Sequence, residues 1–293
     1  MLEYDEEMID LSAQLRHFRA THTYKHLTVA GRDWQYLTGG DGCGRDVLLL
    51  LPGATGLGEV AFQLIMRFER NYRVISPSYP AGVTTVAQLL DGIIAILDHE
   101  RVEVASIVGG SYSGMVAQCL VRRAPHRVAK LILDHTSAPS RARARTHSLY
   151  HTILALLPSV GIRALFQLGN RLSTMGKTPE QLFWRSYFRH DVIARLTKED
   201  YLSRIRVCID FYEHYSFEPE ELSSWPGALL IIESDNDSYV PAKERAALRA
   251  FYPSAQVFTF CGTGHGAWAN QFETFFSIIA RFLRSEEPDK RSS

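Results

Sequence analysis

The sequence predicts an α/β fold: a mostly parallel central sheet flanked by helices, with one long helical insertion. Continuously apolar runs at 47–51, 130–133 and 228–232 are typical of strands that are covered on both faces. Segments with helical spacing alternate with these strands over short connections, which favours a parallel sheet. The alternation stops between residues 134 and 225, where only helical patterns occur.

The elements before the insertion follow in order. Residues 1–22 predict a polar amphipathic helix, and 27–29 and 34–37 predict short antiparallel edge strands before a glycine-rich turn at 39–42. Strands are then predicted at 47–51, 72–75, 104–108 and 130–133. The intervening helices are predicted at 59–70, 86–100 and 115–123.

The insertion and the last elements complete the order. Within the insertion, Thr178 and Thr197 each stand at the start of a helical pattern as N-cap residues. Strands follow at 228–232 and 256–260, then a closing helix at about 270–284 and a polar tail at 285–293. We therefore expect a core domain formed by 1–136 and 224–293, with 137–223 as an inserted helical lid.

Composition bounds the function. The 293 residues are 46% hydrophobic and 22% charged, which suits one globular unit with a sizeable core. Lys plus Arg and Asp plus Glu both number 32, so no global field favours nucleic acid or an acidic membrane. A small-molecule partner is expected, and the oligomeric state is left open.

Targeting and metal signals point the same way. The first seven residues are acidic rather than basic, and no apolar run reaches membrane-spanning length, so a cytoplasmic location is expected. Four cysteines, among them Cys43 and Cys261, lack CxxC spacing, which indicates reduced thiols and no metal site. No cofactor is expected.

A candidate nucleophile lies in the run Gly109-Gly110-Ser111-Tyr112-Ser113-Gly114, directly between a predicted strand and a predicted helix. Such a turn is strained and needs small neighbours, because the helix must approach the strand closely. Ser113 stands where the G-x-S-x-G pattern has glycine, and it is an alternative nucleophile. A glycine-rich turn with two capping serines is the simpler interpretation. If Ser111 is the nucleophile, it needs a histidine base and a carboxylate.

The base and acid candidates lie downstream. His265 lies in a glycine-rich turn between the last predicted strand and the closing helix. The loop after strand 228–232 supplies Asp237, which we expect to accept a hydrogen bond from the histidine and to fix its tautomer. Asp235 in the same loop could instead form an Asx-turn that holds the loop, and in the simpler interpretation both aspartates only shape a turn. Asp134 is the third choice for the acid.

Backbone N–H groups are expected to stabilise the oxyanion. One belongs to Tyr112 at the start of the helix, and the other to Ala54 or Thr55 in the turn that begins at Pro52, which has no N–H itself.

The insertion carries aromatic side chains that could wall an apolar acyl pocket. Helical spacing pairs Phe183 with Tyr187 and Trp184 with Phe188, so one pair can pack inward while the other faces substrate. All four are substrate-binding candidates. The arginines at 141, 143 and 145 are expected to form a solvated face rather than an anion clamp.

Over nearly the whole chain, from Leu27 to Leu283, these features resemble the α/β-hydrolase superfamily, including the order serine, aspartate, histidine. Pro52-Gly53 replaces the usual His-Gly of its first oxyanion turn. The chain looks most like the maspardin-like branch. The collinear matches are Phe18-Arg19 with Lys25, Leu51-Pro52, 72–75 with Tyr79-Pro80, Asp91-Gly92, 97–99, Ala117-Gln118, Glu218-Pro219 and Tyr252-Pro253.

The resemblance implies two kinds of function. Maspardin is regarded as an interaction protein with an incomplete triad, whereas this chain keeps Ser111, Asp237 and His265. We expect a serine hydrolase, a carboxylesterase for a small ester, that works through an acyl-enzyme. The alternatives are a noncatalytic maspardin-type interaction module and a C–C bond hydrolase or acyltransferase with the same triad.

Overall fold

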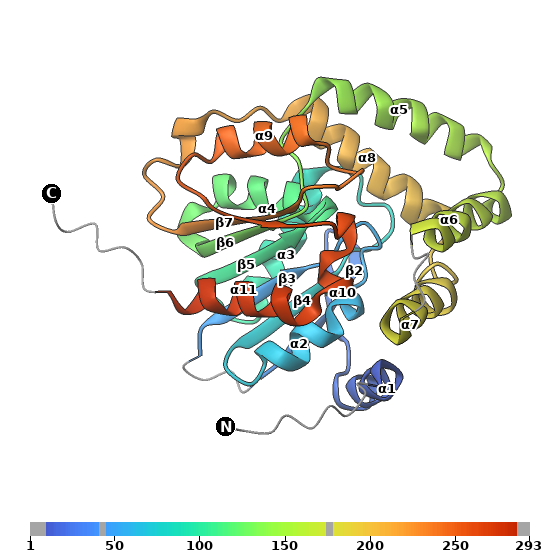
Figure 1. Cartoon of the computed structure of the whole chain (residues 1–293), viewed down its shortest axis with the longest axis horizontal. Coiled ribbons are helices and arrows are strands. Elements are labelled where there is room, and N and C mark those ends of the chain that lie inside the picture. Colours follow the sequence, from blue (N-terminus) through green and yellow to red (C-terminus); the bar gives the residue numbers. More distant parts are fainter. Residues whose placement is uncertain (1–9, 41–44, 174–177, 286–293) are drawn as a thin grey trace, which may run out of the picture.

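The computed structural model describes residues 10–40, 45–173 and 178–285 of the chain. Figure 1 shows a central sheet with helices on both sides of it. Parts of three predictions lie outside the described residues: helix positions 1–9, turn positions 41–42 and tail positions 286–293. Cys43 lies outside them as well.

Within the described residues, the sheet has eight strands in the order β1-β2-β4-β3-β5-β6-β7-β8. The strands are β1 Lys25–Val29, β2 Arg32–Gly39, β3 Val47–Leu51, β4 Arg73–Ser78, β5 Ala105–Gly110, β6 Val128–Asp134, β7 Ala228–Ser234 and β8 Gln256–Phe260. β1 and β2 pair in antiparallel fashion, β2 pairs antiparallel with β4, and β3 to β8 are parallel. The predicted parallel sheet with an antiparallel edge is confirmed.

Both faces of the sheet are covered, which explains the unbroken apolar runs. Along β3, Leu49 and Leu51 belong to one core cluster, which includes residues of the helices α3 and α4. The alternate residues Leu48 and Leu50 belong to a second cluster, which includes residues of α1, α2 and α11. The sheet is therefore packed on both faces. Because β3 to β8 are parallel, their carboxyl ends lie along one edge of it.

The flanking helices are α1 Leu11–Thr21, α2 Phe62–Phe68, α3 Val86–His99, α4 Tyr112–Arg123, α9 Ala242–Phe251, α10 Ala267–Asn270 and α11 Phe272–Arg284. The predicted helix at 59–70 is split, because a 3-10 turn, η1 Gly58–Ala61, precedes α2. The sequence analysis did not predict α9. Only one of its side chains, Leu248, is buried, so its apolar periodicity is weak.

Between β6 and β7, the part of the chain that the structure describes forms four α-helices. They are α5 Arg141–Leu156, α6 Ser159–Ser173, α7 Pro179–Tyr187 and α8 Lys198–His214, with a π-helical turn η3 Phe188–Val192 and a 3-10 turn η4 Pro219–Leu222. Thr178 and Thr197 form capping boxes at the starts of α7 and α8, as predicted. In Figure 1, α5, α6 and α7 lie toward the right of the view, and α1 lies beside α7.

Among the described residues, no helix is both long enough and apolar enough to cross a membrane.

Candidate active site

The turn between β5 and α4 presents Ser111 in a strained backbone conformation. Its φ is 51°, a left-handed value that a residue with a side chain adopts only when its surroundings hold it there. The Ser111 N–H donates to the Asp134 carbonyl over 2.7 Å, and the Thr136 hydroxyl donates to the Ser111 carbonyl over 2.7 Å. The last residue of β6 and the segment after it therefore fix both polar groups of the Ser111 backbone.

Glycine is required beside this turn because other atoms come close. A Cβ on Gly109 would lie 2.7 Å from the Ser113 carbonyl oxygen, and one on Gly114 would lie 2.5 Å from Cβ of Thr136. The small residues seen in the sequence thus allow α4 to approach the sheet and the Thr136 segment.

Ser113, the alternative nucleophile, is fully buried, with 0% of its surface exposed. Its hydroxyl lies 2.9 Å from the Leu51 carbonyl, to which it donates, and it accepts from the Gly110 N–H over 3.0 Å. This side chain closes the turn from within and is not available to a substrate.

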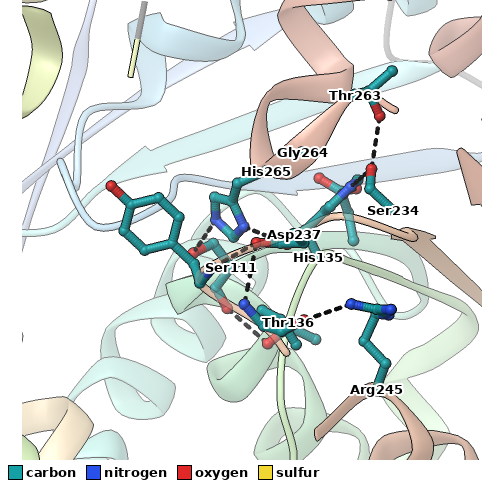
Figure 2. Close-up of polar contacts among 12 residues, drawn as sticks. Ser111, His135, Thr136, Ser234, Asp237, Arg245, Thr263, Gly264 and His265 are labelled. Atoms are coloured by element: carbon teal, nitrogen blue, oxygen red, sulfur yellow. Dashed lines mark hydrogen bonds and ion pairs between the residues drawn. The ribbon is translucent and has the colours of Figure 1, made fainter. Parts of the chain in front are cut away.

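His265 lies between Ser111 and Asp237, as Figure 2 shows. Its Nδ1 is 2.7 Å from Asp237 Oδ2, and its Nε2 is 3.0 Å from Ser111 Oγ. Because the carboxylate can only accept, the proton lies on Nδ1, and Nε2 is left to accept from the serine hydroxyl. Three side chains from three loops therefore meet at hydrogen-bond distance.

Asp237 is held in its ionised form by its neighbours. Burial by itself raises the pKa of Asp237. The hydrogen bond and charge of His265, with the N–H groups of Tyr239 and Val240, outweigh burial and hold the net pKa below its ordinary value. These N–H groups donate to Asp237 Oδ1 over 2.8 and 3.1 Å. The carboxylate is thus available to stabilise a positively charged imidazole.

The other acidic candidates have different partners. Asp235 accepts from the Gly262 N–H over 2.8 Å, and its neighbour Asn236 accepts from the Gly264 N–H over 2.6 Å. These contacts tie the loop after β7 to the turn that carries His265. Asp235 therefore shapes the loop, while Asp134 Oδ1 lies 2.5 Å from Nδ1 of His135.

His135 is a feature that the sequence analysis missed. It is 3% exposed, its ring lies edge-on to that of His265 at 5.7 Å, and its Nε2 is 2.7 Å from Ser234 Oγ. Ser234 Oγ is in turn 2.7 Å from the hydroxyl of Thr263 (Figure 2). These contacts link His135, which directly follows the residue whose carbonyl binds the Ser111 N–H, to the turn that carries His265.

The protonation of His135 follows from its carboxylate neighbours. Burial lowers the pKa of His135, but the nearby carboxylates of Asp134, Asp237 and Glu233 raise it by more, so the net pKa is raised. The only sequence signal for this residue was an Asp-His pair directly after a strand.

The expected oxyanion donors lie around the same point. Ala54 and Thr55 line the cavity above Ser111, and Tyr112 is the first residue of α4. Within the part of the chain that the structure describes, no hydrogen bond uses the backbone N–H of these three residues. The Tyr112 side chain is buried against Tyr79, so only its backbone can serve the site.

A cavity of about 260 Å³ opens above Ser111. Its wall is mostly apolar, and among the described residues that line it there is no lysine or arginine. Its polar side chains are those of Thr55, Gln63, Ser111, Asp134, His135 and His265. The cavity is therefore suited to a neutral, largely apolar molecule.

The structure decides which aromatic pair of α7 and η3 faces the cavity. Trp184 and Phe188 line it, together with Trp268 and Phe272 of α10 and α11, which the sequence analysis did not propose as substrate-binding residues. Trp268 and Phe272 follow the His265 turn in sequence, outside residues 137–223. Helical spacing within 137–223 therefore could not indicate them.

Phe183 and Tyr187, the other predicted substrate-binding pair, lie away from this cavity. Both pack against Phe62, with ring centroids 6.0 and 6.4 Å from it, and neither lines the cavity. The Tyr187 hydroxyl also donates to the buried Glu59 over 3.1 Å. This pair attaches the insertion to the core.

Comparisons with known proteins agree with this architecture. Over 263 residues the chain is 26% identical to 2-hydroxymuconate semialdehyde hydrolase of Pseudomonas putida. The match covers 79% of this chain and 82% of that protein. It is 26% identical over 276 residues to the putative carbamate hydrolase RutD of Caulobacter vibrioides, covering 87% and 96% of the two chains. No family model matches.

A hydrolase from Pseudomonas aeruginosa has a similar structure, with a TM-score of 0.75 at 19% identity, covering 90% of this chain and 99% of that one. The fold and the sequence relatives place the chain in the α/β-hydrolase superfamily. The two sequence relatives, from P. putida and C. vibrioides, are named as a hydrolase and a putative hydrolase. These names support an enzyme of this superfamily.

Proposed function

We propose that the protein is a serine hydrolase that cleaves a small, neutral carboxylic ester through an acyl-enzyme. The observation that carries the proposal is the continuous hydrogen-bond path from Ser111 through His265 to Asp237. This arrangement activates an alcohol that is otherwise too weakly acidic to attack a carbonyl at neutral pH.

In the first half of the reaction, Ser111 Oγ attacks the ester carbonyl while His265 Nε2 takes the hydroxyl proton. Asp237 stabilises the resulting imidazolium without taking the proton itself. His265 then gives the proton to the departing alkoxide, which leaves as the alcohol. In the second half, His265 takes a proton from water, the hydroxide attacks the acyl-serine, and Ser111 recovers its proton as the acid leaves.

Backbone N–H groups are expected to stabilise the negative charge of the tetrahedral intermediate. The Tyr112 N–H lies at the start of α4, where the helix dipole adds positive potential. Ala54 or Thr55 supplies the second N–H from the cavity wall. Removing one such donor typically costs about 10²- to 10³-fold in rate.

The cavity chemistry favours an ester over an anionic substrate. The Pseudomonas putida relative is named for a substrate that is a carboxylate. Here the described lining residues offer no arginine or lysine to pair with such a group, and Asp134 adds a carboxylate of its own. A C–C bond hydrolase with the same triad is the second candidate, because the P. putida relative is named as the hydrolase of a semialdehyde rather than of an ester.

We further propose that residues 137–223 act as a lid over the core formed by 1–136 and 224–293. Trp184 and Phe188 support this role, since they reach the cavity from the insertion. Their aromatic surface would exclude water around the acyl chain and strengthen the electrostatic interactions at Ser111.

The test is labelling with a small fluorophosphonate, followed by turnover of p-nitrophenyl esters of increasing chain length. The native chain should be labelled at Ser111 and should hydrolyse the esters, and Ser111→Ala and His265→Ala should lose both properties. Ser113→Ala is the matched control, because its buried hydroxyl cannot reach substrate, and it should still be labelled.

The outcomes separate the alternatives. Labelling without ester turnover would favour C–C hydrolysis or acyl transfer. A folded native protein with neither labelling nor turnover would overturn the serine hydrolase and favour a noncatalytic, maspardin-type interaction module.

A further inference from the structure

The two inserted helices α5 and α6 expose an unusual amount of apolar surface. Most of the large exposed hydrophobic side chains among the described residues belong to these helices. We call six of them the outer face: Leu149, Ile153, Leu156, Val160, Leu165 and Leu168. Leu156 and Val160, near the corner where the two helices meet, are 82% and 77% exposed. A patch of this kind on a water-soluble domain marks a surface that contacts something apolar.

Helical geometry shows that this exposure is organised. On α5, Leu149, Ile153 and Leu156 follow at intervals of four and three residues and so share one side of the helix. The buried residues Ala144 and Leu154 lie on the opposite side, and α5 packs extensively against α8. In Figure 1, α5 and α6 run along the periphery of the molecule, away from the sheet.

The charge of this region is one-sided. Between Asp134 and Glu180 the sequence has five arginines and one lysine but no aspartate or glutamate. Because the whole chain has a net charge of zero, the remainder is net negative. The zero net charge of the whole chain therefore conceals a basic segment between Asp134 and Glu180.

The basic side chains are placed to act together with the outer face. Arg145, Arg163 and Arg171 are exposed, whereas Arg143 is occupied by Glu244 at 2.5 Å. Arg145 lies one turn before Leu149 on the same side of α5, and Arg171 lies one turn after Leu168 on α6. Exposed arginines thus border the apolar residues along both helices.

We propose that the outer face docks on an anionic lipid surface, with its leucines entering the interface and its arginines among the head groups. Amphipathic helices with apolar and basic residues bind membranes in this way without spanning them. Each arginine near an anionic surface strengthens binding by about fivefold. The proposal concerns a surface separate from the Ser111 site and does not depend on the serine chemistry.

A second copy of this chain is a poorer occupant than lipid. A symmetric dimer through the outer face would bring the same arginines of both copies close together. No acidic residue of the segment from His135 to Pro179 could offset that repulsion, because the segment has none. Anionic head groups satisfy both the apolar and the charged part of the face.

The experiment is flotation of the full chain with vesicles of equal parts phosphatidylglycerol and phosphatidylcholine, compared with pure phosphatidylcholine. The native chain should float with the anionic vesicles, less so at high salt. The double variant Leu156→Ser/Val160→Ser should weaken binding at least about tenfold. Arg145→Gln/Arg163→Gln should weaken it about 25-fold and reduce its salt dependence.

Matched controls keep the result specific. Val104→Ser removes an exposed valine outside the insertion and should bind as the native chain does. Ser111→Ala should also bind normally, so that failure of the proposed chemistry and failure of this proposal are distinguishable. The outer-face variants should keep the circular dichroism spectrum and the thermal unfolding midpoint of the native chain, which shows that they fold whether or not the protein hydrolyses esters.

Three results would overturn the proposal. One is that the native chain floats with neither kind of vesicle. Another is equal binding to both kinds. The third is a native oligomer, measured by light scattering, that Leu156→Ser/Val160→Ser converts to monomers, since this would make the outer face a contact between copies.

Discussion

The helix that follows Ser111 and the first inserted helix differ sharply in what they bury. In α4, every residue from Tyr112 to Val121 is buried. In α5, which is longer, only Ala144 and Leu154 are buried. α4 is enclosed by strands and by α3, so it can hold a strained serine in one position. α5 is attached along one side only, so most of its surface is available for contact with other molecules. Under the two proposals above, reaction geometry and surface recognition are carried by different regions.

The largest expected effect is a loss of kcat when Asp237 is replaced, and it tests the role of Asp237 in the reaction. Asp237→Asn should lower kcat about 10³- to 10⁴-fold at neutral pH, because an amide can leave His265 in the wrong tautomer. The neighbouring Asp235→Asn is the matched control and should cost less than about tenfold, since the Asp235 carboxylate accepts from the Gly262 N–H rather than from His265. Steady-state kinetics with p-nitrophenyl acetate measures both. Equal losses in the two variants would contradict the assignment of Asp237.

A pair of glycine substitutions compares the rigidity of the two regions. A Cβ on Gly92 in α3 would lie 1.9 Å from the Trp34 ring, so Gly92→Ala should destabilise the fold by about 3 kcal/mol. Gly169 in α6 has no atom within 4 Å of such a Cβ, so Gly169→Ala should stabilise by about 0.5–1 kcal/mol. Urea unfolding measures both changes. The same sign for both would refute the contrast.

Two histidines sharpen the comparison through pH. The pKa of His135 is raised in the fold, so its protonated form stabilises the fold below an unfolded pKa of about 6.5. That contribution is lost as the pH rises through the folded pKa. His135→Gln should therefore cost about 1–3 kcal/mol at pH 5.5, and less at pH 9.

His147 in α5 should respond in the opposite direction. Burial lowers the pKa of His147, and the charge of Arg143 adds to this. The fold thus favours the neutral form and loses stability as the pH falls through about 6.5. His147→Gln should therefore gain stability relative to the native chain on going from pH 9 to pH 5.5. Tm against pH for both variants is the measurement, and parallel curves would show that the pKa shifts have no such effect.

The smallest effect concerns the cavity wall that the insertion supplies. Phe188→Ala should enlarge the cavity and change the ratio of kcat/KM between long-chain and short-chain esters by about tenfold. Phe183→Ala is the control, because Phe183 packs on Phe62 outside the cavity, and it should leave that ratio unchanged. A change in the ratio for Phe183→Ala alone would reverse the assignment of the two faces.

Local patterns in the sequence predicted the platform well. The continuously apolar run at 47–51 and the small residues around Ser111 reflect constraints that act over a few residues: burial on both faces, and close approach of helix to strand. The capping residues Thr178 and Thr197 are equally local, and they mark the starts of α7 and α8.

Features that depend on a distant partner were not predictable in this way. Helical spacing gave two aromatic faces for α7 and η3, but Phe62 and Glu59, far away in sequence, decide which face is turned to the core. α9 escaped notice because its single buried residue gives no period. His135 lacks a local signature, since its partner Ser234 lies on another strand.

By itself, the sequence determined the alternation of strands and helices apart from α9, the serine turn and the choice of His265 and Asp237 as candidates. Backbone sterics and alternation of apolar residues act between near neighbours, so they can be read along the chain. Only the tertiary structure decided that His265 lies within 3.0 Å of both Ser111 and Asp237, that Trp184 rather than Tyr187 lines the cavity, and that α5 and α6 expose their leucines. Those outcomes depend on which distant surfaces pack together, and contact between distant segments leaves little trace in local spacing.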